Sequence, residues 1–232
     1  IKHDAVKIME FTREGDLYRN GFGELIDLED EYVYPILKSS DLGNSRIEPR
    51  KYVLVTQTYT GEDTGIISIK APKTWHYLLK HSVELDNRRS TIYQNRPRFS
   101  IFGIGRYSFS PWKVAVSGLY KSFHFVVVPP YSDRPMMIDD TCYSIPCNTE
   151  AEANFLFTIL SSNSAKSFFE SLIFKDSKRP VTIDVLRRFS FESIAKHLGR
   201  HNELHLFVNS GKFYEDDEKQ LLMVMEHDGN NF

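Results

Sequence analysis

The pattern of apolar and polar residues along the chain changes near residue 147. Before this point, apolar and aromatic residues form short runs or alternate with polar residues, which is typical of strands. These runs predict strands at 51–59, 98–104, 112–117, 123–128 and 136–144. A helix is predicted among them over 71–89, because Pro72 suits a first helical position and apolar residues follow at helical spacing.

After residue 147 the apolar residues recur with the 3.6-residue period of helices. Asn148 or Thr149 can cap a helix that runs to about Leu160. Further helices are predicted over 164–174, from Thr182 and from Phe191. The first 30 residues show only weak periodicity, and the last 30 mix turn signals with an apolar run, so neither stretch indicates one kind of element.

This order of elements predicts the α+β class. A twisted, mostly antiparallel β-sheet region is expected over about 30–147, followed by a helical region over about 148–200. We expect residues 1–30 to be a connecting segment. Residues 31–147 should form a β-rich region, and residues 148–232 should pack on it as a helical region within one compact unit.

The composition suits a globular chain that buries its own core, since 41% of the 232 residues are hydrophobic and 26% are charged. The longest apolar runs, at 125–128 and 221–225, are far shorter than a membrane helix, so we expect no membrane partner. The two cysteines, Cys142 and Cys147, make no disulfide framework and fit a reducing cytoplasm. The chain starts at Ile1 without an initiator Met, which suggests a piece of a longer protein.

Basic residues concentrate in one stretch, although the net charge of the chain is only −2. Between residues 86 and 125, seven Lys and Arg residues are balanced by Asp86 alone, and aromatic residues stand between them. Lys and Arg bind phosphates, Arg also binds guanine, and aromatic rings stack on bases. The stretch favours nucleic-acid binding, with a merely solvated strand face as the alternative. Arg96 and Arg98 flank a proline, and an extended backbone would direct them to opposite faces.

Two short motifs resemble parts of a methyl-transfer site but lack its chemistry. The run Phe102-Gly103-Ile104-Gly105 is similar to the glycine turn that holds S-adenosylmethionine, and Val128-Pro129-Pro130-Tyr131 is similar to the motif that grips a flipped adenine. Val128 has no acceptor for the adenine amino group, and no helix is predicted after Gly105. Only 23 residues separate Gly105 from Val128, too few for the intervening βαβ units.

Other catalytic patterns are incomplete. The run Asp176-Ser177-Lys178 is only half of a nuclease motif. His197, His201 and His205 have the spacing of a zinc site on one helix, but Gly199 is expected to end that helix and turn residues follow. The sequence therefore predicts no catalytic residue and no metal site in this chain.

A succession of segments carries a resemblance to a known family. The segments are KYVLVTQTYTGEDT (51–64), APKTWHYLLKH (71–81), RPRFSIFGIGRYSFSPWKVAVSGLYK (96–121), MIDDTCYSI (137–145), NFLFTILSSNSAKSFFESLIF (154–174) and KRPVTIDVLRRF (178–189). Over about residues 30–190 the chain resembles the C-terminal target-recognition region of gamma-type adenine-N6 DNA methyltransferases. These are the modification enzymes of restriction–modification systems, including those fused to an endonuclease. The run FGIGRYSFSPWK with the downstream SGLYK is the most specific part.

The resemblance implies a domain that reads double-stranded DNA. In such enzymes, an upstream Rossmann-like domain binds S-adenosylmethionine and methylates an extruded adenine. This chain lacks both catalytic motifs, so we expect no cofactor in it and S-adenosylmethionine in a missing catalytic domain. That domain would be joined in cis or act in trans. The expected location is the cytoplasm of a bacterium or archaeon.

The residues expected to contact DNA are basic or aromatic. They are Lys51, Arg96, Arg98, Arg106, Tyr107, Trp112, Lys113 and Lys121, with Arg88 and Arg89 as contacts to the DNA backbone. Arg106 stands where many relatives have an acidic residue, and Trp112 suits a core position equally well. Three alternatives stay open: a specificity-subunit-like protein that acts with a separate methyltransferase chain, a protein-interaction module, and an enzyme in its own right.

Overall fold

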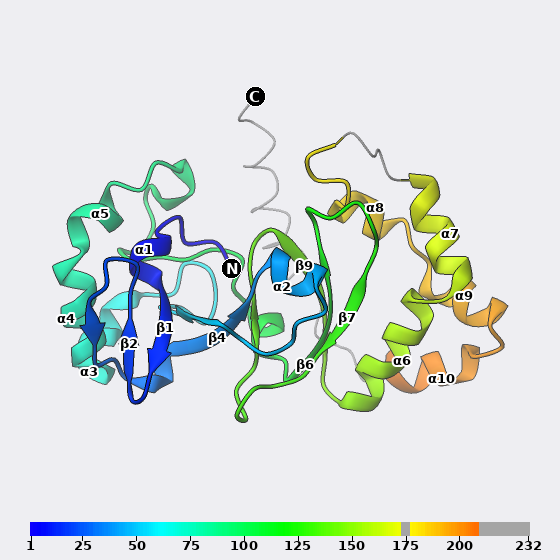
Figure 1. Cartoon of the computed structure of the whole chain (residues 1–232), viewed down its shortest axis with the longest axis horizontal. Coiled ribbons are helices and arrows are strands. Elements are labelled where there is room, and N and C mark those ends of the chain that lie inside the picture. The colour runs from blue at the N-terminus through cyan, green and yellow to red at the C-terminus, as the bar shows by residue number, and fades with distance from the viewer. Residues whose placement is uncertain (173–176, 209–232) are drawn as a thin grey trace. The chain divides into compact units, whose positions relative to one another are not determined.

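The computed structural model describes residues 1–172 and 177–208, which fold into two compact units (Figure 1). The first unit comprises Ile1–Ile36 and Pro49–Phe109, and the second comprises Leu37–Glu48 and the described chain from Ser110 onward. Both units contain helices and antiparallel strands, so the predicted α+β class is confirmed. The boundaries expected at residues 30 and 147 do not coincide with this division.

An antiparallel sheet in the order β3-β2-β1-β5-β4 forms the first unit. Its strands are β1 (Glu10–Glu14), β2 (Leu17–Arg19), β3 (Leu25–Ile26), β4 (Val33–Leu37) and β5 (Lys51–Leu54). Residues 1–30 therefore contribute three strands. Strands of two to five residues are too short to produce a clear periodic signal, which is why the sequence indicated only a connecting segment.

The sheet order continues from β4 to the short strand β8 (Met137–Ile138). This strand lies beside Leu37, the last residue of β4 and the first residue of the second unit. The backbone N–H of Asp139, which follows β8, donates to the Leu37 carbonyl at 3.0 Å. The pairing of β8 therefore lies within the second unit.

Short helices accompany the sheet of the first unit. The α-helices are α1 (Val6–Met9), α3 (Ile67–Lys70), α4 (Pro72–Lys80) and α5 (Ser82–Asp86), and 3₁₀ turns occur at Asp30–Tyr32, Thr64–Ile66, Thr91–Tyr93 and Arg106–Phe109. The helix predicted over 71–89 is confirmed in α4, with Pro72 in its first turn. It is interrupted at His81, and α5 follows.

The start of α4 is held by a side chain from another part of the chain. Ala71 stands at the cap position and has no side-chain acceptor. The Glu29 carboxylate accepts instead from the backbone N–H groups of Lys73 (2.9 Å) and Thr74 (2.8 Å). A carboxylate at a helix N-terminus accepts hydrogen bonds from the free N–H groups and is attracted by the positive end of the helix dipole.

Aromatic side chains join α4 to the sheet of the first unit. Tyr77 lies 5.9 Å from the ring of Phe11, which in turn lies 5.9 Å from Tyr18. The Tyr77 hydroxyl donates to the carbonyl of Ile8 at 2.7 Å and accepts from the Asn20 side-chain amide at 3.1 Å. The buried hydroxyl is thus satisfied, as a polar group in a core must be.

The second unit is built on a three-stranded antiparallel sheet in the order β7-β6-β9. Its strands are β6 (Trp112–Ser117), β7 (Phe125–Val128) and β9 (Cys142–Cys147). The central strand β6 pairs with β7 from Lys113 to Val116 and with β9 over its whole length. The strands predicted at 112–117 and 123–128 are confirmed, and β8 and β9 share the region predicted at 136–144.

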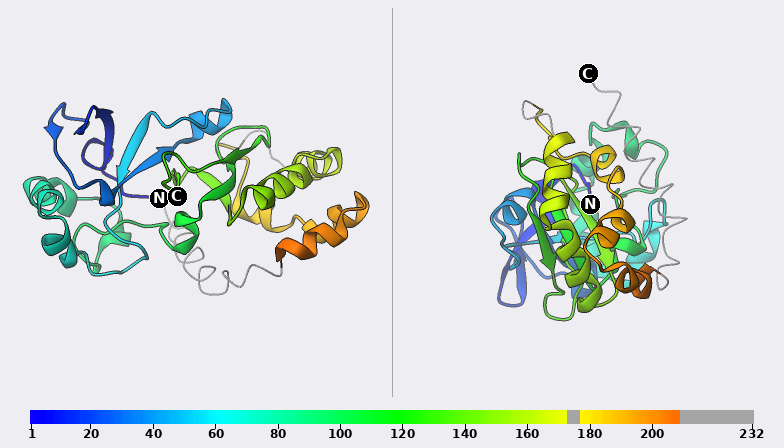
Figure 2. Two further views of the ribbon diagram at one scale, coloured as in Figure 1. Left: turned by 90° about the horizontal axis from the view of Figure 1, so that it is seen from below. Right: turned by 90° about the vertical axis from the view of Figure 1, so that its right-hand side faces the viewer.

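Successive residues of β6 face two different layers. Val114 and Val116 belong to one core cluster with the helices after residue 147, whereas Ala115 belongs to another with Leu37 and Leu42. Alternation of this kind is what the pleat of a strand imposes. Figure 2 shows the later helices gathered on one side of the sheet, and α2 (Ser39–Gly43) packs against β6 from the other side.

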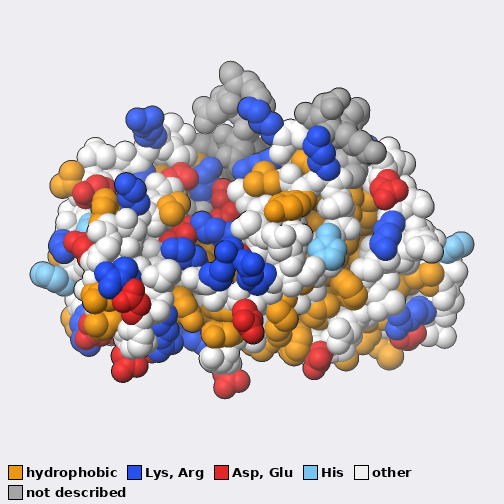
Figure 3. Space-filling model, viewed as in Figure 1, with side chains coloured by type: hydrophobic (Ala, Val, Ile, Leu, Met, Phe, Trp, Pro, Cys, Tyr) orange, Lys and Arg blue, Asp and Glu red, His pale blue; other side chains and the backbone are white. Residues whose placement is uncertain are grey.

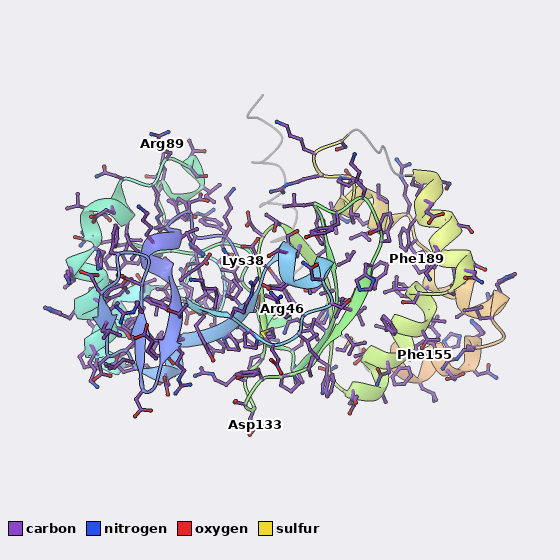
Figure 4. The ribbon with its side chains drawn as sticks, viewed as in Figure 1. Lys38, Arg46, Arg89, Asp133, Phe155 and Phe189 are labelled. Carbon is purple, nitrogen blue, oxygen red and sulfur yellow. The ribbon has the colours of Figure 1, made fainter. Side chains whose placement is uncertain are left out.

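Capping residues start most of the later helices where the sequence placed them. The helices are α6 (Glu150–Leu160), α7 (Asn163–Leu172), α8 (Ile183–Arg187), α9 (Phe191–His197) and α10 (His201–Val208). Thr149 accepts from the N–H of Glu152 at 3.2 Å, and Thr182 accepts from that of Val185 at 3.4 Å. Phe155 of α6 and Phe189, which lies between α8 and α9, both belong to the core cluster of Val114 (Figure 4).

Residues 98–104 do not form the predicted strand. Asn95 and Phe99 have positive φ angles of 57° and 65°, so the chain turns before and within this segment. Among the described residues, the one strand-type pairing of this segment is an isolated bridge between Phe102 and Lys2. Phe99 and Ile101 are fully buried, so the aromatic and branched residues that favoured a strand here fill a core instead.

No helix in the described part of the chain is long and apolar enough to cross a membrane. The apolar run at 221–225 and the other residues after 208 lie outside the described residues.

We expect Gly118→Ala to lower the free energy of unfolding by about 1–3 kcal/mol. An added Cβ would lie 2.7 Å from the carbonyl oxygen of Thr141, which accepts the Gly118 N–H at 2.9 Å and cannot rotate away. Chemical denaturation measures the loss. Gly43→Ala is the matched control, because its nearest atoms belong to the 37% exposed side chain of Tyr120, which can move. Equal losses in the two variants would contradict this account.

Candidate nucleic-acid interface

One surface of the second unit joins two segments that are far apart in the sequence. It consists of residues 38–46, which contain α2, and residues 117–124, which end β6 and lead to β7; we call it the α2 surface. A hydrogen bond joins the buried hydroxyls of Ser39 and Ser117. A second hydrogen bond of 2.5 Å joins the Ser45 hydroxyl to Nε2 of His124. The 117–124 loop is therefore attached to the α2 segment at both of its ends.

The middle of the 117–124 loop is held by close packing. The ring of Tyr120 lies against Gly43, the last residue of α2, so closely that an added Cβ would be 2.6 Å from both Cε atoms. A Cβ at position 43 would push the exposed ring away from α2. Tyr120 remains 37% exposed and its neighbours Leu119 and Lys121 are exposed, so the loop displays an aromatic ring beside a cation.

The charge on the α2 surface is mainly basic, and its one acid is buried. The side chains of Lys38 and Arg46 are 30% and 41% exposed, and Lys121 is exposed. Asp41 is 5% exposed; it accepts from the Lys38 backbone N–H at 3.0 Å and lies 3.3 Å from the Arg46 guanidinium. Figure 3 shows Lys and Arg side chains gathered on this face, where Figure 4 labels Lys38 and Arg46. The Nζ of Lys38 lies 3.9 Å from the Asp139 carboxylate, so Arg46 and Lys121 are the exposed cations here that suit phosphate binding.

Of the residues predicted to contact DNA, Lys121 is part of the α2 surface. Lys38, Ser45, Arg46 and His124 were missed by the sequence analysis, because the two segments are about seventy residues apart and residues 38–46 lie outside the basic stretch at 86–125. The SGLYK run gave the only local signal, since it forms most of the 117–124 loop.

Five predicted contacts are exposed on the first unit. They are Lys51, Arg89, Arg96, Arg98 and Arg106. Arg98 forms a two-pronged ion pair with Asp86, with Nη2 2.6 Å from Oδ2, and this hydrogen bonding raises the pKa of Arg98. No ion pair is present for Arg96 in the described structure; its guanidinium lies 6.0 Å from the ring of Phe102. The two arginines therefore differ in their ion pairing, and the backbone between them turns instead of running extended.

Arg88 is a structural residue of the first unit. Its Nη1 donates to the carbonyls of His3 (3.2 Å) and Ser100 (2.7 Å), and its guanidinium lies 3.7 Å from the centre of the Tyr93 ring. Burial lowers the pKa of Arg88. Because these contacts tie three backbone segments together, we leave Arg88 out of the contact set.

Trp112 and Lys113 are adjacent on β6 and point to opposite faces. Trp112 packs against the core cluster of Val114, and Tyr107 is half-buried in a 3₁₀ turn. Lys113 is only 1% exposed, and its Nζ donates to the Ser110 carbonyl at 2.6 Å. Burial lowers the pKa of Lys113 to about 7. A buried ammonium cannot reach a phosphate, so Lys113 also leaves the contact set.

The two methyl-transfer-like motifs lie at turn and core positions. Gly103 (φ +62°) packs against Ile1, and a 3₁₀ turn at Arg106–Phe109, rather than an α-helix, follows Gly105. Val128 is fully buried in β7. The motif residues themselves therefore lack the helix start expected after the glycine turn and a side-chain acceptor at Val128.

The histidines near residue 200 lie on two helices. His197 ends α9, Gly199 follows with a φ of +68°, and α10 begins at His201. His201 and His205 share α10, where the sequence suggested a turn, and their Nε2 atoms are 2.9 Å apart. In the described parts of the chain, no three His, Cys, Asp or Glu side chains form a group that could hold a metal ion.

Comparison with known proteins relates the chain to a methyltransferase. No family model matches the chain. Over 197 residues, which are 84% of its length, the chain is 45% identical to the type II methyltransferase M.NspV of Nostoc sp. (strain ATCC 29411 / PCC 7524). The chain is thus related to a methyltransferase. It spans 41% of the length of that relative.

The pH dependence of stability tests the burial of Lys113. Its pKa is about 7 in the folded state and 10.5 as the ordinary value, so above pH 7 the unfolded chain binds more protons. The contribution of Lys113 to the free energy of unfolding should rise with pH, by at most about 1.4 kcal/mol per unit, and fall as pH drops to 7.

The measurement is the difference in unfolding free energy between wild type and Lys113→Met, from denaturant titrations between about pH 7 and pH 8.5. Burial raises the pKa of Cys142 and of Cys147 to about 12, from an ordinary 9.0, and the contribution of these thiols cancels in the difference because both proteins carry them. Lys113→Met should lose its relative stability as the pH rises. A difference that is independent of pH would mean that the ammonium is solvated.

Proposed function

We propose that the chain is the DNA-recognition part of a type II, adenine-N6-specific DNA methyltransferase of a restriction–modification system. The observation that carries this proposal is the 45% identity to M.NspV over 84% of the chain. Many of the predicted contacts are exposed, and the α2 surface adds further cations and an aromatic ring. Both features suit contacts to a phosphate backbone and to bases.

Methyl transfer itself belongs, in this proposal, to a catalytic domain outside the chain. M.NspV is more than twice as long as the segment it shares with this chain, which leaves room for such a domain. That domain would bind S-adenosylmethionine and hold the extruded adenine. This chain would bind and orient double-stranded DNA, with the catalytic domain joined to it in cis or supplied by a separate chain.

Specificity is the task that a separate recognition part performs. The affinity for any duplex comes from Lys and Arg contacts to phosphates, and the choice of site comes from contacts to base edges. The parent protein would act in a prokaryotic cytoplasm, where the DNA to be modified is.

Duplex DNA binding tests the proposal directly. The chain should bind a labelled duplex at about 50 mM salt and lose much of its affinity at about 200 mM, with a slope of about −0.9 per phosphate contact in log K against log salt. Arg46→Ala and Lys121→Ala should each reduce the magnitude of the slope by about one unit.

Lys196→Ala is the matched control for these variants. Lys196 lies on α9, in the helical layer across the sheet from α2, and pairs with Glu192. Its loss should leave the slope unchanged. Undetectable binding at the lower salt would refute the proposal, and DNA binding without any response in the Arg46 and Lys121 variants would remove the α2 surface from it.

Arg96 and Arg98 should respond differently to alanine. Arg96→Ala should weaken DNA binding without changing the melting temperature, because in the described structure it has no ion pair to lose. Arg98→Ala breaks a pair whose side chains are 46% and 47% exposed, so it should cost about 0–1 kcal/mol of stability. Binding isotherms and thermal melts of both variants decide this, and equal binding losses would show that Arg98 leaves Asp86 for DNA.

A further inference from the structure

A tight hairpin follows β7 in the second unit. The backbone N–H of Tyr131 donates to the Arg134 carbonyl at 2.9 Å, and the Arg134 N–H donates back to the Tyr131 carbonyl at 3.0 Å. Ser132 and Asp133 form the two-residue tip and are exposed, and Figure 4 shows Asp133 at the outer end of this projection. The hairpin therefore presents a carboxylate at its most distant point.

The conformation of the tip is one that its residues do not favour by themselves. Ser132 and Asp133 both have positive φ angles, 48° and 60°. Two-residue hairpins need this geometry, and Asn-Gly or Asp-Gly normally supply it. Side chains at both positions are held there only because the surrounding structure imposes the turn.

Prolines and the core supply that constraint. Pro129 and Pro130 precede the tip and Pro135 follows it, so the backbone of both legs has little freedom. The legs end in Val128 and Met136, which are 0% and 1% exposed in the same core cluster. The hairpin is thus a stiff projection, and little conformational entropy is lost when it binds.

We propose that this hairpin enters the major groove of DNA and that Asp133 accepts a hydrogen bond from the N4 amino group of a cytosine. This inference rests on the proposed function. It gives a role to the VPPY run, whose residues form the first leg of the hairpin.

The chemistry of the tip determines the choice of ligand. A carboxylate at the end of a projection is repelled by phosphates, so it does not add general affinity for DNA. It does pair with the exposed amino group of cytosine, and the major groove is wide enough for a two-stranded ribbon. A carboxylate that is repelled at other sites and accepts a hydrogen bond from one base raises the specificity of binding rather than its strength.

Selection from randomised duplexes tests the role of Asp133. Wild type should demand cytosine at one position, and Asp133→Gly should lose this preference, by about 5-fold to 150-fold, and keep the rest of its site. Ser132→Gly is the matched control: it relieves the same backbone constraint and retains the carboxylate, so its site should equal that of wild type. Thermal melts confirm that both variants are folded.

A second measurement removes the amino group from the DNA instead. A duplex whose selected cytosine is replaced by an analogue without the 4-amino group should bind wild type more weakly but bind Asp133→Gly unchanged.

An identical base profile in wild type and Asp133→Gly overturns this inference and leaves DNA recognition in place. A shift in both glycine variants would show that the shape of the turn, and not the carboxylate, reads the site, and would also overturn it. Absence of any DNA binding by wild type refutes the proposed function as well.

Discussion

The pairing of β6 along both of its edges is the constraint on which the second unit depends. A strand with neighbours on both sides has no free edge, so only its two faces remain to be filled. Helices fill one face and the α2 segment with its core cluster fills the other. Because side chains alternate along the strand, the even-numbered residues of β6 face the helices and the odd-numbered residues face α2. This decides that Trp112 joins the helical layer and that Lys113 is buried on the other side.

The elements that could be predicted are those specified by neighbouring residues. Thr149 and Thr182 cap helices where the sequence placed them, and Pro72 opens α4. The strand predicted at 98–104 was wrong because burial and strand formation favour the same residue types. The turns at Asn95 and Phe99 are what distinguish a buried irregular segment from a strand here. The short strands of residues 1–30 were missed for a different reason, since each is shorter than the window in which a period can be seen.

The candidate site was less predictable than the fold, because charge in a sequence does not reveal its partners. Arg88 and Lys113 counted toward a basic stretch, yet one links backbone carbonyls and the other is enclosed in the core. Arg46 stood outside that stretch and lies on the surface beside residues that were in it. A cation can contact DNA only if the fold leaves it exposed, and this depends on contacts between distant segments.

The packing of Tyr120 on Gly43 has a consequence for exchanging parts between related proteins. The 117–124 loop is not a self-contained module, because the Tyr120 ring in its present position packs on Gly43, a residue without a Cβ that lies seventy-seven positions earlier. In a chimera that takes only the loop from a relative, the side chain of that relative at position 120 meets the α2 end of the recipient. The smallest transferable unit is therefore discontinuous: the loop together with the segment from Lys38 to Arg46.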